Sequence, residues 1–115
     1  MKKRIYIAGK LSDPHLDYLK NVYKMVQTAE QVRRAGFSVY VPGLDLLQAL
    51  IMGDLEYSDL FNNSQPWLEV SDAVFLVPGW GTSEGTKKEI AKATMLGIPI
   101  FEDLEEMKEY FEQEK

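Results

Sequence analysis

A glutamate on the inward face of a predicted helix is the residue of this 115-residue chain best placed to do chemistry. On a helix of about 100° per residue that follows Ser83, Glu89 falls within the same arc as Thr86, Ile90 and Ala93. A glutamate side chain does not reach water from such a position, whereas the longer stem of a lysine would. A carboxylate held against an apolar surface, just past a glycine-rich turn, is a candidate catalytic group.

A structural alternative accounts for the same glutamate. Residues 86–89 fit a capping box, in which Thr86 is the N-cap and the Glu89 side chain folds back to the Thr86 backbone N–H. A capping box would explain Glu89 without any chemistry. The segment by itself leaves both interpretations open.

The composition excludes several classes of site. With no cysteine and one histidine, the chain offers no disulfide, no thiol nucleophile and no cysteine- or histidine-rich metal site. The formal net charge of −5 argues against general nucleic-acid binding. No apolar run approaches the ~18 residues of a membrane span, and residues 5–8 are too short for the core of a signal peptide. We expect one domain over residues 1–115, in the cytoplasm and away from membranes, that uses no metal or other cofactor.

Apolar patterning predicts alternating strands and helices. The expected strands are residues 4–8, 37–41, 72–77 and 98–101, and the expected helices are 16–35, 44–52, 83–96 and 104–111. Residues 55–70 are expected to be a loop that leads into a helical turn, because they contain Asn62, Asn63, Ser64 and Pro66. The strands are continuously apolar, so both faces of the sheet should be covered. This predicts an α/β, single-domain, flavodoxin- or Rossmann-like three-layer sandwich with a mostly parallel sheet of four or five strands.

The expected strand order, 2-1-3-4, places a ligand site where the first and third strands end. The first strand runs into Gly9 and Lys10. The third runs into the glycine-rich turn 78–83, which leads into the helix of Glu89. Hydroxyl groups at a helix N-terminus suit a phosphate or a ribose hydroxyl. Trp80, on the loop above the sheet, is the candidate to stack on a base or sugar, with a dimer contact as its alternative.

Several segments together resemble the nucleoside 2-deoxyribosyltransferase superfamily. They are residues 5–9, 35–42, 71–80 and 97–100, and the motif Ser83-x-Gly85-Thr86-x-x-Glu89. The likeness spans nearly the whole chain and is strongest to the small members that carry a Pro-Gly-Trp motif. In that family a glutamate at the Glu89 position is the nucleophile that attacks the anomeric carbon, and a tyrosine at the Tyr6 position can steady it. Tyr6 fits a core aromatic equally well.

The resemblance favours hydrolysis over base transfer. Transferases of the family carry an aspartate where this chain has Ser83, whereas the branch that hydrolyses deoxynucleoside 5′-monophosphates has a serine there, on the phosphate. Lys10 would serve the same anion as a point charge, or it is a surface lysine. The residues expected around the ligand are Gly9, Lys10, Gly79, Trp80, Ser83, Gly85 and Thr86, with Glu89 and Tyr6 as the catalytic pair.

The chain departs from the family at one further position. Where the family usually has an aspartate that helps the sugar hydroxyl and the leaving base, eight residues before Asp72, this chain has Ser64. Asp54 and Asp59 are the candidates to compensate. Asp72 itself is expected to satisfy local backbone donors. His15 is expected in solvent or as a cap, with protonation of a leaving base as its alternative role.

The sequence therefore carries two functional hypotheses. The first is an N-glycosidase or a deoxyribosyltransferase acting on a nucleoside, deoxynucleoside or 5′-monophosphate, with Glu89 as nucleophile and hydrolysis favoured over base transfer. The second is a binding module that holds a nucleotide or a nucleotide derivative without turnover. A phosphoribohydrolase motif fits less well, because Gly85 stands where that motif has its glutamate. We also expect a homodimer or higher homo-oligomer, because family members complete their sites across subunits and aromatic residues outside the strands are numerous: Tyr18, Tyr23, Tyr57, Phe61 and Trp67.

Overall fold

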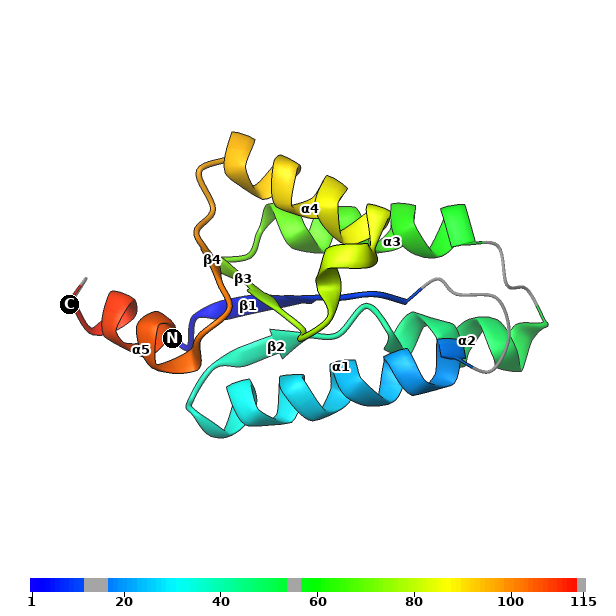
Figure 1. Cartoon of the computed structure of the whole chain (residues 1–115), viewed down its shortest axis with the longest axis horizontal. Helices are drawn as coiled ribbons and strands as arrows, with labels where there is room; N and C mark the ends of the chain where they lie inside the picture. Colours follow the sequence, from blue (N-terminus) through cyan, green and yellow to red (C-terminus); the bar gives the residue numbers. More distant parts are fainter. Residues whose placement is uncertain (12–16, 54–56, 114–115) are drawn as a thin grey trace.

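The computed structural model describes residues 1–11, 17–53 and 57–113; for residues 17, 18, 46, 50 and 57–60 it describes the backbone alone. Strands and helices alternate along the chain (Figure 1). The strands are β1 Arg4–Ala8, β2 Ser38–Tyr40, β3 Ala73–Leu76 and β4 Ile100–Phe101. The helices are α1 Asp17–Arg34, α2 Leu44–Met52, α3 Tyr57–Glu69, η1 Trp80–Thr82 (a short 3₁₀ turn), α4 Glu84–Met95 and α5 Leu104–Gln113.

The described strands form one parallel sheet in the order β2-β1-β3-β4. In the register, Ile5 pairs with Val39 on one side and with Ala73 on the other. Figure 1 shows α3 and α4 on one side of the sheet and α1 on the other. The predicted α/β three-layer fold and its strand order are therefore confirmed.

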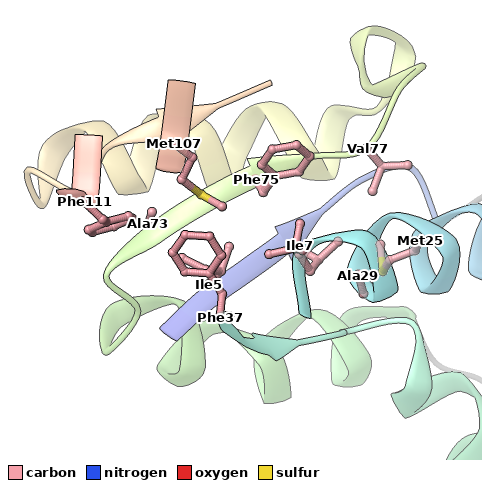
Figure 2. Packing of buried hydrophobic residues seen from close by; sticks show 11 residues of the cluster. Ile5, Ile7, Met25, Ala29, Phe37, Ala73, Phe75, Val77, Met107 and Phe111 are labelled. Carbon is pink, nitrogen blue, oxygen red and sulfur yellow. The ribbon is translucent and has the colours of Figure 1, made fainter. Parts of the chain in front are cut away.

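Alternate strand residues point to opposite faces of the sheet, and both faces are buried. The face toward α1 and α5 carries Ile5, Ile7 and Phe75, which pack with Met25 and Met107 (Figure 2). The face toward α3 and α4 carries the second core cluster: Tyr6, Ala8, Leu68, Val74, Leu76 and Ala93. Burial of each large apolar side chain contributes about 1.5–3 kcal/mol to the stability of the fold. In a sheet covered on both faces every strand residue is buried, so its strands are apolar at successive positions.

The prediction of a loop before residue 70 is wrong. Residues 57–69 form a single helix, α3, with Pro66 inside it. Pro66 is exposed, so the carbonyl that loses its helical partner can turn to water. On the opposite side of α3, Ser64 is 2% exposed and Leu68 is fully buried. Burial of this face outweighs the weak helix propensity of the polar residues.

Asp72 ties the start of β3 to β1. Its Oδ2 atom accepts a hydrogen bond of 2.7 Å from the backbone N–H of Arg4. The expectation that Asp72 satisfies backbone donors is confirmed, and this contact sets the relative register of the two central strands.

Candidate active site

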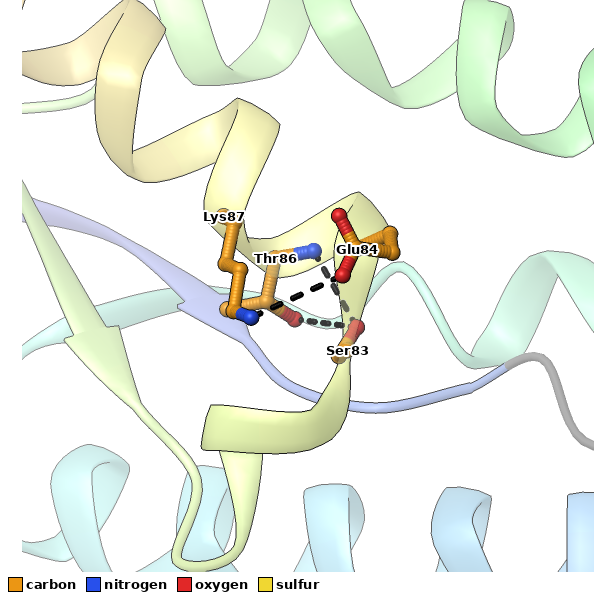
Figure 3. A network of polar contacts seen from close by, with 4 residues as sticks. All are labelled: Ser83, Glu84, Thr86 and Lys87. Carbon is orange, nitrogen blue, oxygen red and sulfur yellow. Dashed lines mark hydrogen bonds and ion pairs between the residues drawn. The ribbon is translucent and has the colours of Figure 1, made fainter.

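Ser83 is the N-cap of α4, the helix that carries Glu89. The Ser83 hydroxyl accepts hydrogen bonds from the backbone N–H of Thr86 (3.1 Å) and from the Thr86 hydroxyl (2.9 Å), as Figure 3 shows. The N-cap is therefore Ser83, and Thr86 lies within the first turn of α4. The capping-box alternative, with Thr86 as N-cap and Glu89 folded back to it, is wrong.

The Glu89 carboxylate is buried and points into the protein. Glu89 is 6% exposed, and its Oε2 accepts a hydrogen bond from the hydroxyl of Tyr6, which is fully buried in β1. Burial raises the pKa of Glu89 to about 7, although the hydrogen bonds from Tyr6 and Gln65 and the charge of Lys92 pull it down. Burial, followed by the negative charge of Glu89, raises the pKa of Tyr6 above its usual range. Near neutral pH, Glu89 is thus present both as a carboxylate and as an acid.

A small cavity adjoins this carboxylate. Its lining comes from β1 and the segment after it, from α1, from the segment after β2, and from α3 and α4. The lining residues are Ile7, Gly9, Leu11, Met25, Pro42, Phe61, Ser64, Gly85, Thr86 and Glu89. The cavity measures about 20 Å³, which is room for about one water molecule. A nucleoside is many times larger, so its binding requires the cavity to widen.

Comparison with known proteins identifies the family. Residues 3–102 match the family model described as a domain of unknown function, DUF4406. The chain belongs to the DUF4406 family. No curated protein matched this DUF4406 chain.

A solved 2-deoxyribosyltransferase from the psychrotolerant bacterium Bacillus psychrosaccharolyticus is similar in structure. It shares 22% sequence identity with this DUF4406 chain over 84% of the chain and 69% of its own length, with a TM-score of 0.56. The likeness supports the fold that the sequence resemblance implies.

The structure brings together five of the nine predicted site residues. Gly9, Gly85, Thr86 and Glu89 line the cavity, and Tyr6 contacts Glu89. Gly9 sits against β3, because a Cβ atom built on it would lie 2.7 Å from the Val77 side chain. A glycine is therefore required at this strand end for packing alone, whatever else its backbone does.

The other four predicted residues are not in the cavity lining among the described residues. Ser83 is the buried N-cap of α4. Gly79 has a φ of 89°, which favours glycine at the entry to η1. Trp80 is half-buried, and its Nε1–H donates to Glu102 Oε1 at 2.6 Å. Lys10 is half-exposed at the end of β1.

Sequence reasoning missed the contribution of α3. Gln65 hydrogen-bonds to Glu89 and so lowers the pKa of that carboxyl. Ser64 lines the cavity and donates to the Phe61 carbonyl at 2.9 Å. Ser64, at the position where the resemblance implies an aspartate, therefore lines the same cavity as Glu89. The spacing of Phe61, Ser64 and Leu68 was the available signal, but the polar residues between them hid it.

Three predicted contributors cannot be placed. Asp54, His15 and the side chain of Asp59 lie outside the described residues. Among the residues that are described, no group of three or more acidic or histidine side chains could hold a metal ion. None of the helices in the described ranges is both long and apolar enough to cross a bilayer.

Proposed function

We propose that this protein hydrolyses the N-glycosidic bond of a nucleoside, a deoxynucleoside or the corresponding 5′-monophosphate, with Glu89 as the nucleophile. The observation that carries the proposal is the buried Glu89 carboxylate, which faces a cavity at the carboxyl edge of the sheet and accepts a hydrogen bond from Tyr6. Ligand sites of doubly wound sheets lie at this edge. The same fold in a 2-deoxyribosyltransferase adds support.

The proposed reaction has two carboxylate steps. In the first, an ionised Glu89 oxygen attacks C1′, and the bond from C1′ to the base nitrogen breaks. The base leaves with the bonding electrons and takes up a proton, and the sugar is joined to Glu89 as an ester. In the second, water attacks C1′ and loses a proton to solvent, the ester bond breaks, and the carboxylate is restored. The Tyr6 hydroxyl orients the carboxylate for both steps.

Ser83 supports a monophosphate substrate within this proposal, and it supports hydrolysis only through the resemblance, which implies a serine here in the hydrolytic branch. Both lone pairs of its hydroxyl accept hydrogen bonds from Thr86, so its hydrogen is left to donate. A phosphate oxygen near the N-terminus of α4 would accept that hydrogen and would benefit from the helix dipole.

A non-catalytic binding module is the alternative. Ser64 favours it, because among the described lining residues Glu89 is then the only carboxyl group beside the cavity. A leaving base must be protonated, and a serine is a poor acid for that purpose. The same cavity, once widened, would then hold a nucleotide without cleaving it.

Direct assay separates the two functions. We would incubate the protein with each common nucleoside, deoxynucleoside and 5′-monophosphate and measure free base by chromatography. Glu89→Gln serves as the test variant. Glu84→Gln is the matched control, because Glu84 is on the same helix but its side chain is 83% exposed.

Base released by the wild type and the control, but not by Glu89→Gln, is the result expected of the glycosidase. If calorimetry shows that a nucleotide binds but no base is released from any substrate, the protein is a binding module and not a glycosidase. Equal base release by wild type and Glu89→Gln would remove Glu89 from the nucleophile's role.

A further inference from the structure

A second, larger groove lies between α1 and the turn from β4 into α5. Its volume is about 620 Å³, within the range of about 300–1,000 Å³ that is usual for small-molecule sites. It is lined by Lys24, Gln27, Thr28, Gln31, Phe75, Val77, Pro78, Glu102, Asp103, Leu104 and Glu105. No described residue lines both this groove and the Glu89 cavity.

The packing of α5 explains why the groove is open. Met107 and Phe111 are the buried residues of this helix, and the Phe111 ring packs on Phe37 with a centroid separation of 5.7 Å. Figure 2 shows Met107 and Phe111 toward one end of the core cluster and Val77 at the other. On the face of the sheet that α1 covers, the described part of the chain places no second helix over the carboxyl end of β3, and the groove lies there.

One wall of the groove is acidic. It carries the carboxylates of Glu102, Asp103 and Glu105, whereas Lys24 is the one cation among the described lining residues. Glu102 accepts the Trp80 indole N–H, and Asp103 Oδ1 accepts the backbone N–H of Glu106 at 3.1 Å. Each of these two carboxylates keeps a second oxygen that can accept a further hydrogen bond.

The Thr28 hydroxyl gives an independent indication of a ligand. Thr28 is 8% exposed and lines the groove from α1. Among the described residues we find no hydrogen-bond partner for its hydroxyl. The Thr28 oxygen is not among the fully buried, unpartnered atoms of the described residues, so it is open to the groove and can bond to a donor or acceptor that enters.

We infer that this groove binds a primary ammonium group on an aliphatic stem. The ammonium donates to the free carboxylate oxygens of the acidic wall and to the Thr28 hydroxyl. The stem lies on Phe75, Val77 and Leu104, which make the apolar part of the lining. A free aliphatic diamine and the side chain of a lysine both carry this chemistry.

Trp80 provides the measurement, because its indole touches the acidic wall. The chain has two tryptophans, so Trp67→Phe leaves Trp80 as the only one. In this background we would titrate 1,4-diaminobutane, N-acetyl-lysine amide and, as the uncharged control, 1,4-butanediol. Trp80 fluorescence and calorimetry should both report saturable binding of an amine and none of the diol. Tighter binding of the diamine points to a free amine as the natural ligand, and tighter binding of the lysine amide points to a lysine side chain.

Substitutions on the two walls should act in opposite directions. Glu105→Gln and Thr28→Val should each weaken amine binding about tenfold, since each removes one hydrogen-bonding partner of the ammonium. Lys24→Gln should tighten binding several-fold, because it removes the only cation among the described lining residues. Glu106→Gln is the matched control: it lowers the charge of the same helix by the same amount, but Glu106 does not line the groove.

Three results would overturn the inference. They are the absence of saturable amine binding, equal binding of the diol, and equal weakening by Glu105→Gln and Glu106→Gln, which would indicate diffuse attraction to an acidic protein. If Thr28→Val does not fold, the opposite effects of Lys24→Gln and Glu105→Gln still decide the question.

Discussion

Glu89 should make the folded protein less stable as the pH rises. Its pKa is about 7 in the folded protein and 4.5 in the absence of burial, so between these values the folded state holds a proton that the unfolded state releases. The free energy of unfolding therefore falls with rising pH across this window. At about 1.4 kcal/mol for each pKa unit, the full loss is about 3 kcal/mol.

Glu89→Gln is the perturbation that isolates this effect. Glutamine keeps the size of the side chain and an oxygen that can accept the Tyr6 hydroxyl, but it does not titrate. Between about pH 4 and about pH 8, the free energy of unfolding of the variant should rise by about 3 kcal/mol relative to that of the wild type. Titration of other groups cancels in this difference.

Urea denaturation of both proteins at several pH values measures the difference. The exposed control variant, Glu84→Gln, should follow the wild type, because its carboxylate lies in water in both states. If the unfolding free energies of wild type and Glu89→Gln run parallel from about pH 4 to about pH 8, burial does not raise the pKa of Glu89 and the reasoning fails.

Three further predictions follow from the same geometry. Base release should fall as the pH drops through about 7, because a protonated Glu89 is no nucleophile. Tyr6→Phe should move the midpoint of the pH–rate profile to higher pH, since it removes a hydrogen bond to the ionised form of Glu89. A profile that does not move would contradict the role of Tyr6 in stabilising the carboxylate. Gly9→Ala should destabilise the fold by about 1–3 kcal/mol in urea denaturation, because the new Cβ would lie 2.7 Å from the side chain of Val77, just after β3. Gly81→Ala is the control and should be tolerated, because nothing lies within 4 Å of a Cβ at that position. Ile51 is 75% exposed on α2. If this apolar surface joins two copies of the chain, Ile51→Lys should convert a dimer into a monomer, as measured by sedimentation. A wild type that sediments as a monomer would contradict the expected homo-oligomer.

The strands could be predicted because their signal is local. A strand buried on both faces must be apolar at successive positions, and residues 4–8 and 73–76 show that pattern without interruption. The inward direction of Glu89 was predicted for the same reason, since helical spacing records which side of a helix is buried.

Helix α3 could not be predicted in the same way. Its polar residues and Pro66 are typical of a loop, and the burial of Ser64 and Leu68 depends on strands that lie elsewhere in the sequence. With α3 taken for a loop, Gln65 could not be recognised as a neighbour of Glu89. The resemblance to a known family pointed to Tyr6, which no periodicity distinguishes from an ordinary core aromatic.

Apart from α3, the sequence by itself determined which segments are strands and helices and which of their faces are buried, because those properties repeat every two or every three to four residues along the chain. Only the tertiary structure decided what each buried face meets. Tyr6 and Glu89 are 83 residues apart, and the hydrogen bond between them, like the raised pKa of Glu89, arises from packing β1 against α4. The groove beside Thr28 likewise exists because α5 packs toward the other end of the sheet. Such contacts depend on the distance between side chains in space, which local spacing does not record.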